Sequence, residues 1–354
     1  DLVMAPLGQA LAGVQTLVVS PDGELNRMPF AALPAPEGEG LLSDRYQLRL
    51  ITTGRELLDL QKPVERRGQT PLVVANPDFD LLLSSDAVAA LPDASGSDEV
   101  SAFAEAGQLR SAETDQLVWA PLPGTKKEGE KVSTLIDGEL LMNREARAAA
   151  IQEASVPSVL HIASHAFFLP DQEEEKDEPE AQLSSIGLRG EQGLRASKLA
   201  GESPLLRSGI ALAGANRVSE NQVEGSKDDG YLTALEVAQL DWAGTELVVI
   251  SACESGKGEI KAGEGVYGLK RAIAVSGARS SLLSLWKVDD TATAAFMENF
   301  YRRLKAGEGR ADALAATQKD FRSHPVPAWQ HPSVWAAFQL SGDWGPISGL
   351  SSEN

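Results

Sequence analysis

The most informative segment of this chain reads Leu247-Val248-Val249-Ile250-Ser251-Ala252-Cys253-Glu254-Ser255-Gly256 and contains the only cysteine of the sequence. Its apolar run predicts a buried strand, and the small residues after the thiol predict a Gly-containing loop. A second apolar run, 159–163, is followed by His165. Open α/β sheets carry their sites at the carboxyl ends of strands, so we expect the thiol and the imidazole to emerge from two strands of one sheet.

Each of these residues has a simpler explanation when it is taken alone. A buried cysteine is more often a small hydrophobe than a nucleophile, and a buried histidine is more often a core residue than a base. Cys253 and His165 both follow a predicted strand and both precede small residues. Together they favour a catalytic Cys-His pair.

Length and composition indicate a folded protein. The 354 residues are 42% hydrophobic, which is enough for one large domain or two small ones. No apolar stretch approaches the ~20 residues that cross a bilayer, and the first residues show no basic, apolar leader. A single cysteine forms no internal disulfide, so we expect a soluble protein of a reducing, cytoplasmic compartment.

The net charge of the chain indicates which classes of partner it favours. A net charge of -19 argues against a nucleic-acid partner, because phosphate binding depends on clusters of Lys and Arg. The acidic field either favours basic peptides or only aids solubility. The sequence has no closely spaced Cys and His ligands, so we expect neither a metal nor another cofactor.

Short apolar runs alternate with helical patterns, which predicts an α/β sheet. The expected strands are 16–20, 46–51, 72–75, 159–163, 209–213, 247–250 and 281–286. We expect a supporting part over 1–115, with a mobile insertion from about 80 to 112, and an active part over 116–348. Helices are predicted from Leu122 onward, from Arg144 with Asn143 as its cap, over 266–277 and over 290–307.

Two polar segments lie near the predicted site. Residues 171–180 contain seven acidic side chains in ten, and residues 216–230 form a Gly-containing loop with little periodicity. Either segment covers the site or is an ordinary surface loop. If the protein cleaves itself after basic residues, Arg217 and Lys227 are the expected positions.

Several motifs resemble those of the CHAT domain, a branch of the caspase-like (clan CD) cysteine peptidases related to separase, legumain and metacaspases. They are residues 161–166, 247–256 and 285–290, with further similarity at 19–23, 29–34, 76–78, 122–124 and 335–338. The resemblance implies a caspase-hemoglobinase-like fold, a mostly parallel sheet flanked by helices, with an N-terminal pseudo-protease half and a C-terminal active half. It also implies that Cys253 is the nucleophile and His165 the catalytic histidine.

The resemblance and the chemistry together assign roles at the site. Attack of the thiolate on a peptide carbonyl gives a thioester, which water then hydrolyses. The backbone amides of Ala166 and Cys253 are the expected oxyanion donors. Relatives often carry Gly where this chain has Ala166. His161 lies four residues before His165 on the same strand face, about 13 Å back, and a structural or orienting role is favoured for it.

Specificity is expected to depend on Asp289, Asp290, Glu254 and Trp286. The carboxylates near the end of a strand beside the nucleophile suggest a pocket for Arg or Lys before the cleaved bond. Alternatively, Asp290 caps the helix that starts at Thr291, and Asp289 is solvated.

The sequence therefore predicts a cysteine endopeptidase that acts on a protein or peptide substrate and is regulated by another module or chain. The alternative is a catalytically silent CHAT-like scaffold that binds peptides. No membrane partner is expected.

Overall fold

The computed structural model describes residues 7, 10–35, 40–62, 66–81, 114, 117–169, 204–220, 228–254 and 264–350. The predicted insertion at 80–112 lies almost entirely outside this part of the chain, as do the acidic run 171–180 and Lys227. No helix within the described residues is long and apolar enough to cross a membrane.

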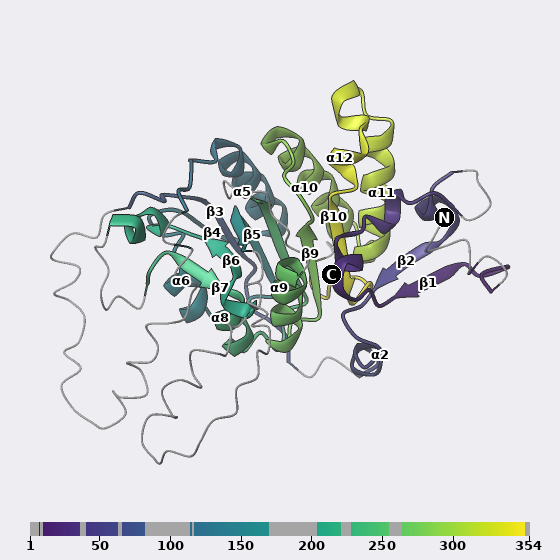
Figure 1. The fold of residues 1–354 in the computed structure, drawn as a ribbon, viewed down its shortest axis with the longest axis horizontal. Coiled ribbons are helices and arrows are strands. Elements are labelled where there is room, and N and C mark those ends of the chain that lie inside the picture. The colour runs from purple at the N-terminus through teal and green to yellow at the C-terminus, as the bar shows by residue number, and fades with distance from the viewer. Residues whose placement is uncertain are drawn as a thin grey trace, which may run out of the picture.

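A ten-stranded sheet forms the centre of the described structure (Figure 1). Its main path has the order β1-β2-β10-β9-β8-β5-β3-β4, and β6 and β7 extend from β5. The strands are β1 (Thr16–Val19), β2 (Gln47–Leu50), β3 (Leu72–Pro77), β4 (Glu139–Asn143), β5 (Val159–Phe168), β6 (Ser208–Ala211), β7 (Tyr231–Thr233), β8 (Leu247–Glu254), β9 (Ser280–Ser284) and β10 (Phe338–Gly342). Most neighbours are parallel; β9 with β10, β5 with β6 and β6 with β7 are antiparallel. The mostly parallel sheet expected from the sequence is confirmed.

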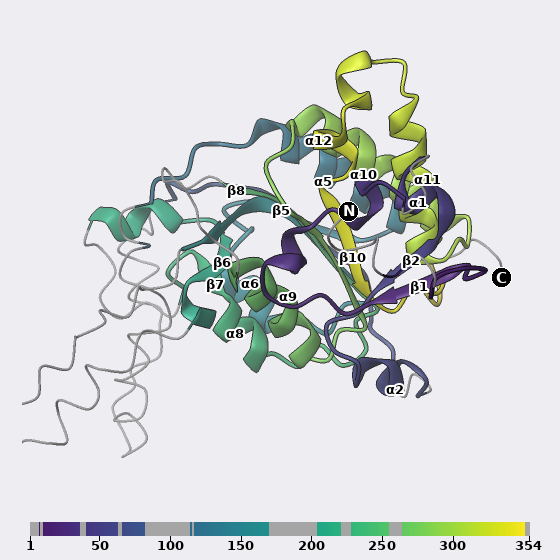
Figure 2. The ribbon, with the colours of Figure 1, turned by 45° about the vertical axis from the view of Figure 1, so that its right-hand side comes forward.

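Helices cover both faces of the sheet (Figures 1 and 2). One face packs against α5 (Pro123–Ile136), α10 (Asp290–Lys305) and α11 (Arg310–Arg322), and the other against α6 (Ala148–Glu153), α8 (Ala234–Gln239) and α9 (Glu264–Val275). The short helices are α1 (Leu42–Arg45), α2 (Glu56–Leu60), α12 (Pro332–Trp335), and the 3-10 turns η2 (Gly23–Arg27), η3 (Phe30–Ala32), η7 (Pro204–Leu206), η8 (Ala215–Glu220) and η9 (Pro327–Gln330).

The apolar runs of the sequence form the central strands because both of their faces are covered. Every residue of β5 is buried. In β8, Leu247 and Val249 face α5 and α10, whereas Val248 and Ile250 face α9. A strand enclosed on both sides reads as a continuous apolar run, which is why β5 and β8 were recognisable from the sequence.

Some elements were not anticipated. Asn143 does not cap a helix: it ends β4 with a φ of 53°, and α6 begins only at Ala148. The prediction was wrong because β4 has no β-branched residue and does not read as a strand. The helix α11 is likewise absent from the sequence-based expectations. Gly277 and Gly307 do follow α9 and α10 with positive φ, as their predicted helix stops require.

Strands from both predicted parts of the chain join the same sheet. Strand β3, from 1–115, lies between β4 and β5, and β1 and β2 extend the opposite edge beyond β10. The boundary near residue 115 therefore does not separate two sheets, and the division into two halves stays a prediction about domain organisation.

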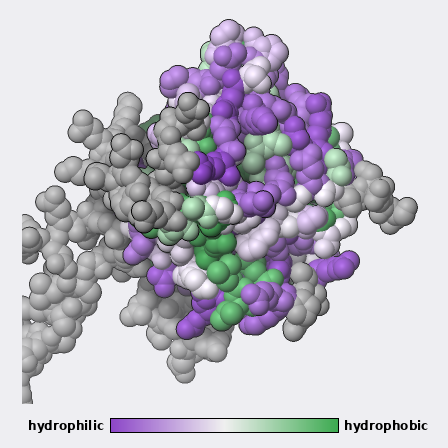
Figure 3. Space-filling view, turned by 90° about the vertical axis from the view of Figure 1, so that its right-hand side faces the viewer, coloured by the Kyte–Doolittle hydropathy of each residue, from purple (hydrophilic) through white to green (hydrophobic). Residues whose placement is uncertain are grey.

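The edge of the sheet at β1 is apolar. Figure 3 shows a band of hydrophobic residues on this side of the molecule. In β1 the Val18 side chain is 42% exposed, and Val14 just before it is 36% exposed. Nothing in the described structure shows what covers this band, so the band alone assigns no partner.

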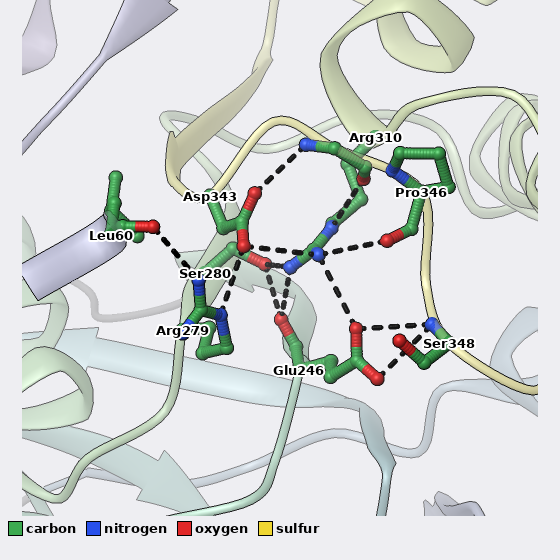
Figure 4. A network of polar contacts seen from close by, with 9 residues as sticks. Leu60, Glu246, Arg279, Ser280, Arg310, Asp343, Pro346 and Ser348 are labelled. Carbon is green, nitrogen blue, oxygen red and sulfur yellow. Dashed lines mark hydrogen bonds and ion pairs between the residues drawn. The ribbon is translucent and has the colours of Figure 1, made fainter. Parts of the chain in front are cut away.

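A buried charge network holds the amino ends of β8 and β9 to α11 and the C-terminal segment (Figure 4). Arg310, only 1% exposed, donates hydrogen bonds to the Glu246 carbonyl at 2.7 Å and to Ser280 Oγ at 3.0 Å. It also forms ion pairs of 3.4 Å with the carboxylates of Glu246 and Asp343. Burial alone would raise the pKa of Asp343, but Arg310 and its neighbours lower that pKa below its ordinary value.

We predict that Arg310→Met lowers the free energy of unfolding by about 3–5 kcal/mol, because it leaves the buried Glu246 carboxylate without a counter-charge, whereas Asp343 keeps its ion pair with Arg279. Urea denaturation measures the loss. The matched control is Arg302→Met, in an exposed pair with Glu298, which is expected to cost less than about 1 kcal/mol. Equal midpoints for the two variants would contradict a stabilising role for the network.

Lys270 of α9 is a buried cation in contact with the N-terminal elements. Its Nζ lies 3.4 Å from Asn26 Oδ1, and its side chain is 3% exposed. Burial lowers the pKa of Lys270 from 10.5 to about 8, against the opposing attraction of Glu56. Below pH 8 the folded protein therefore carries a buried ammonium at a cost in stability.

We predict that wild type gains about 3 kcal/mol of stability relative to Lys270→Met as the pH rises from about 8 to 10.5. In this window the folded state has lost the Lys270 proton while the unfolded state retains it, so unfolding takes up a proton and becomes less favourable with rising pH. Urea denaturation of both proteins across the pH range gives the difference. If the difference in unfolding free energy between the two proteins stays constant or falls as the pH rises, the lowered pKa of Lys270 is refuted.

Candidate active site

The two candidate catalytic residues lie on adjacent strands. Strands β5 and β8 pair in parallel over eight positions, and the register sets His165 opposite Cys253. Because neighbouring strands are about 4.8 Å apart, the two backbones are in direct proximity. Both positions lie near the carboxyl ends of their strands, which is the edge where open α/β sheets place their sites.

The ring of His165 is held by the segment that precedes α5. Its Nε2 lies 2.8 Å from the carbonyl oxygen of Ala120. A carbonyl only accepts, so Nε2 carries the proton of this hydrogen bond. In the neutral ring, Nδ1 is then the nitrogen that can accept a proton, which suits a general base whose other nitrogen is fixed.

Two aromatic side chains enclose His165. The ring centroids of Phe79 and Trp119 lie 5.2 and 5.3 Å from that of the histidine. Trp119 is buried, and its Nε1 donates to the hydroxyl of Tyr231 at 2.9 Å. The imidazole is 2% exposed, so its orientation is closely restricted.

The contacts of His165 with Ala120, Trp119 and Phe79 could not be predicted from the sequence. The segment 117–122 has no regular structure, and nothing in its composition indicates contact with a strand that begins almost 40 residues later. The aromatic residue before the Leu-Pro-Gly helix start was the only available signal.

His161 has a structural environment. Its Nε2 is 3.2 Å from Glu128 Oε1 of α5, and its Nδ1 is 3.1 Å from the Tyr301 hydroxyl of α10. All three side chains are at most 1% exposed. Burial, with the charge of Glu128, raises the pKa of Tyr301 well above its ordinary value, so its hydroxyl stays protonated. These contacts support the structural role expected for His161, and they join β5 to both helices on this face.

The family model of the CHAT domain matches residues 1–343. The chain belongs to the CHAT domain family. Tetratricopeptide repeat protein 28 of Homo sapiens and its Mus musculus counterpart are each 26% identical to it over 99% of the chain. This CHAT domain spans only 13% of the length of those relatives.

Among solved structures, the chain is similar to the Saccharomyces cerevisiae separase-securin complex in two crystal structures. The matches have 12% identity and TM-scores of 0.44 and 0.43. They cover 92% and 90% of this CHAT domain and 15% of the matched chains.

The acidic motif after β9 includes a helix cap. Asp289, not Asp290, is the cap of α10: its Oδ1 accepts from the amides of Thr291 and Ala292, each at 3.0 Å. Asp290 lies against Gly124 of α5, where a Cβ would approach its Cβ to 2.2 Å. Gly124 therefore lets the first turns of α5 and α10 meet at the edge of the sheet that carries His165.

The other residues of the predicted specificity pocket are less defined. Trp286 is half-buried, and its Nε1 donates to the Ser333 carbonyl at 2.7 Å. Glu254 ends β8 opposite Ala166, and its side chain lies outside the described residues. A role for these residues in binding a basic side chain stays a prediction.

The oxyanion role of the Ala166 amide also stays a prediction. Ala166 lies within β5, with Glu254 of β8 on one side and Ile210 of β6 on the other. Backbone amides between two paired strands are normally engaged in the ladder, so an oxyanion role requires a local change at this edge.

A cavity of about 350 Å³ lies elsewhere, between β2 and α11. Its lining includes Arg49, Asp312, Gln318 and Trp344 but neither His165 nor its aromatic neighbours. The described residues hold no cluster of three His, Cys, Asp or Glu side chains that would bind a metal ion. The candidate chemistry is therefore assigned from the β5–β8 edge and not from this cavity.

We predict that Tyr301→Phe lowers the free energy of unfolding by about 1–3 kcal/mol, because it leaves Nδ1 of the buried His161 without a partner. The alkylation rate of Cys253, the only thiol in the chain, is expected to stay unchanged. Thermal or urea unfolding and iodoacetamide kinetics provide the two measurements. A slower alkylation with unchanged stability would instead give His161 a role at the candidate site.

Proposed function

We propose that this CHAT domain is a cysteine endopeptidase in which Cys253 is the nucleophile and His165 the acid–base partner. One observation carries the proposal: the β5–β8 register sets the two residues opposite each other while the Ala120 carbonyl holds His165 Nε2. A nucleophile, a neighbouring base and a group that orients the base are the components of covalent peptide hydrolysis.

In the proposed reaction, the thiolate of Cys253 attacks the scissile carbonyl carbon, and the C–N bond breaks as the amine leaves. His165 accepts the thiol proton at Nδ1 and returns a proton to that amine. Water then attacks the thioester, releases the acid product and regenerates the thiol. The Ala120 carbonyl stabilises the protonated imidazole through the Nε2 hydrogen bond.

The substrate that we propose is a protein or peptide with Arg or Lys before the cleaved bond. Asp290, next to α5, and Glu254, beside the nucleophile, are the carboxylates assigned to this contact; Asp289 has one oxygen engaged by the helix cap. The net charge of -19 favours the approach of basic substrates.

Regulation by another module is part of the proposal. The matched relatives are named as tetratricopeptide repeat proteins, and this chain spans 13% of their length. We propose that a repeat module of this kind, on the same or another chain, controls access to the site. A reducing, cytoplasmic compartment would keep Cys253 as a thiol.

The burial of His165 favours a second candidate, a silent peptide-binding scaffold. The ring is 2% exposed between Phe79 and Trp119, and a catalytic base must reach the substrate. A domain that only binds peptides has no such need.

We expect wild type to cleave basic positions in a positional peptide library, and Cys253→Ala and His165→Ala to lose at least about a thousandfold in rate. His331→Ala, at an exposed histidine, is the matched control and is expected to keep full activity. Candidate activators are added in parallel. If wild type and Cys253→Ala behave alike, and a thiol-reactive peptide probe labels Cys253 no faster than free cysteine, the scaffold replaces the peptidase.

A further inference from the structure

The position of the His165 ring depends on a segment that has no regular secondary structure. Residues 117–122 supply both the Ala120 carbonyl and the Trp119 ring, yet they belong to neither a helix nor a strand. Such a segment is placed by its side-chain and loop contacts, so the residues that anchor it control the geometry of His165.

The Asn216 side chain binds this segment through both of its polar atoms. Its Oδ1 accepts from the Trp119 amide at 2.8 Å, and its Nδ2 donates to the Trp119 carbonyl at 3.0 Å. One primary amide thus satisfies both backbone groups of Trp119, as a neighbouring strand would do. Only Asn or Gln offers a donor and an acceptor in this arrangement.

Asn216 also binds the segment on the other side of the His165 ring. Its backbone N–H donates to the Phe79 carbonyl at 3.0 Å, and its Nδ2 donates to Asp80 Oδ1 at 2.6 Å. Phe79 and Trp119 are the two rings that enclose His165. A single residue therefore anchors both aromatic walls.

The turn that carries Asn216 is itself fixed. Arg217, 4% exposed, donates to the Gly214 carbonyl at 3.2 Å and to the Asp228 carbonyl at 3.4 Å. Gly214 has a φ of 89°, and a Cβ there would approach the Arg217 guanidinium to 2.2 Å. Since Arg217 is enclosed in η8, cleavage after it is inaccessible in this fold.

We propose that Asn216 is a positioning residue for His165, which it orients through Trp119, Ala120 and Phe79. This inference deepens the proposed peptidase function and rests on it where activity is concerned. Loss of the Nδ2 donor frees the Trp119 carbonyl and allows the 117–122 segment, with the Ala120 carbonyl, to move away from Nε2.

Asn216→Asp tests the proposal because it keeps the size of the side chain and removes both Nδ2 hydrogens. The carboxylate would face the Trp119 carbonyl and Asp80; the nearby charged groups are Arg217 and the Asp228–Arg147 pair. We expect kcat/KM at pH 8 to fall at least about tenfold relative to wild type, mainly in kcat. The ratio of the variant's kcat/KM to that of wild type is expected to rise as the pH falls toward about 4, the ordinary pKa of an aspartate, because a protonated carboxyl group again donates.

Asn299→Asp is the matched control. Asn299 also donates through Nδ2 to an aspartate, Asp320, at 3.2 Å, but it lies on α10 away from His165. The kcat/KM of Asn299→Asp is expected to stay close to that of wild type at all pH values. A flat ratio near 1 for Asn216→Asp, or a loss that does not change with pH, overturns the proposal.

A second readout does not require peptidase activity. The chain has four histidines, so ¹³C-labelled histidine gives few signals, and His165→Gln assigns the one of interest. We expect the His165 resonance to shift in Asn216→Asp and not in Asn299→Asp. If Asn216→Asp does not fold, Asn216→Ser is measured in the same way, and an unshifted His165 signal overturns the positioning role.

The two readouts separate the two hypotheses. An inactive wild type with a shifted His165 signal in Asn216→Asp refutes the peptidase and supports the positioning contact. An active wild type with unchanged kinetics and an unshifted signal in Asn216→Asp refutes only the role of Asn216.

Discussion

The parallel pairing of β5 with β8 is the contact on which the candidate site depends. It aligns eight residue pairs, and one of these pairs is His165 with Cys253. A slip of one residue would move His165 to the opposite face relative to its present neighbours, because side chains alternate along a strand. The apolar residues on both faces resist such a slip, since Leu160 and Ile162 pack on one side and Val159 on the other. The packing of these apolar side chains thus fixes the register that places His165 opposite Cys253.

Different kinds of interaction stabilise the two ends of the central strands. At the amino ends, Arg310 pairs with the buried Glu246 and the partly buried Asp343, and it joins β8, β9 and the C-terminal segment through charge-assisted hydrogen bonds. At the carboxyl ends, the contacts around His165 are an aromatic enclosure and hydrogen bonds to backbone atoms. The charged network stabilises the amino-terminal end of the sheet, whereas loops enclose the candidate site at the other end. Open α/β sheets usually divide stability and function between their two ends in this way.

The two histidines on one face of β5 have different surroundings. His161 is enclosed with Glu128 and Tyr301 between β5 and two helices, whereas His165 contacts a loop carbonyl near the strand end. The sequence places both on the same face, and alternation alone does not distinguish them. Their distance from the end of the strand does, because only His165 lies near enough to that end to contact the 117–122 segment.

The sequence by itself determined the α/β class, the buried strands β5 and β8, and the occurrence of Cys253 and His165 near strand ends. These features are local, since an apolar run that is enclosed on both faces leaves a continuous signal in the chain. Only the tertiary structure decided the strand order, the register, the Ala120 and Trp119 contacts with His165, and the enclosure of Arg310 and Arg217. Those features depend on residues that lie far apart in the chain, as in the pairing of Leu50 with Ser341. The short polar or irregular segments that take part have no periodic pattern of their own. The replacement of the expected Asn143 cap by β4 has the same cause, because pairing with β3 outweighed a local preference.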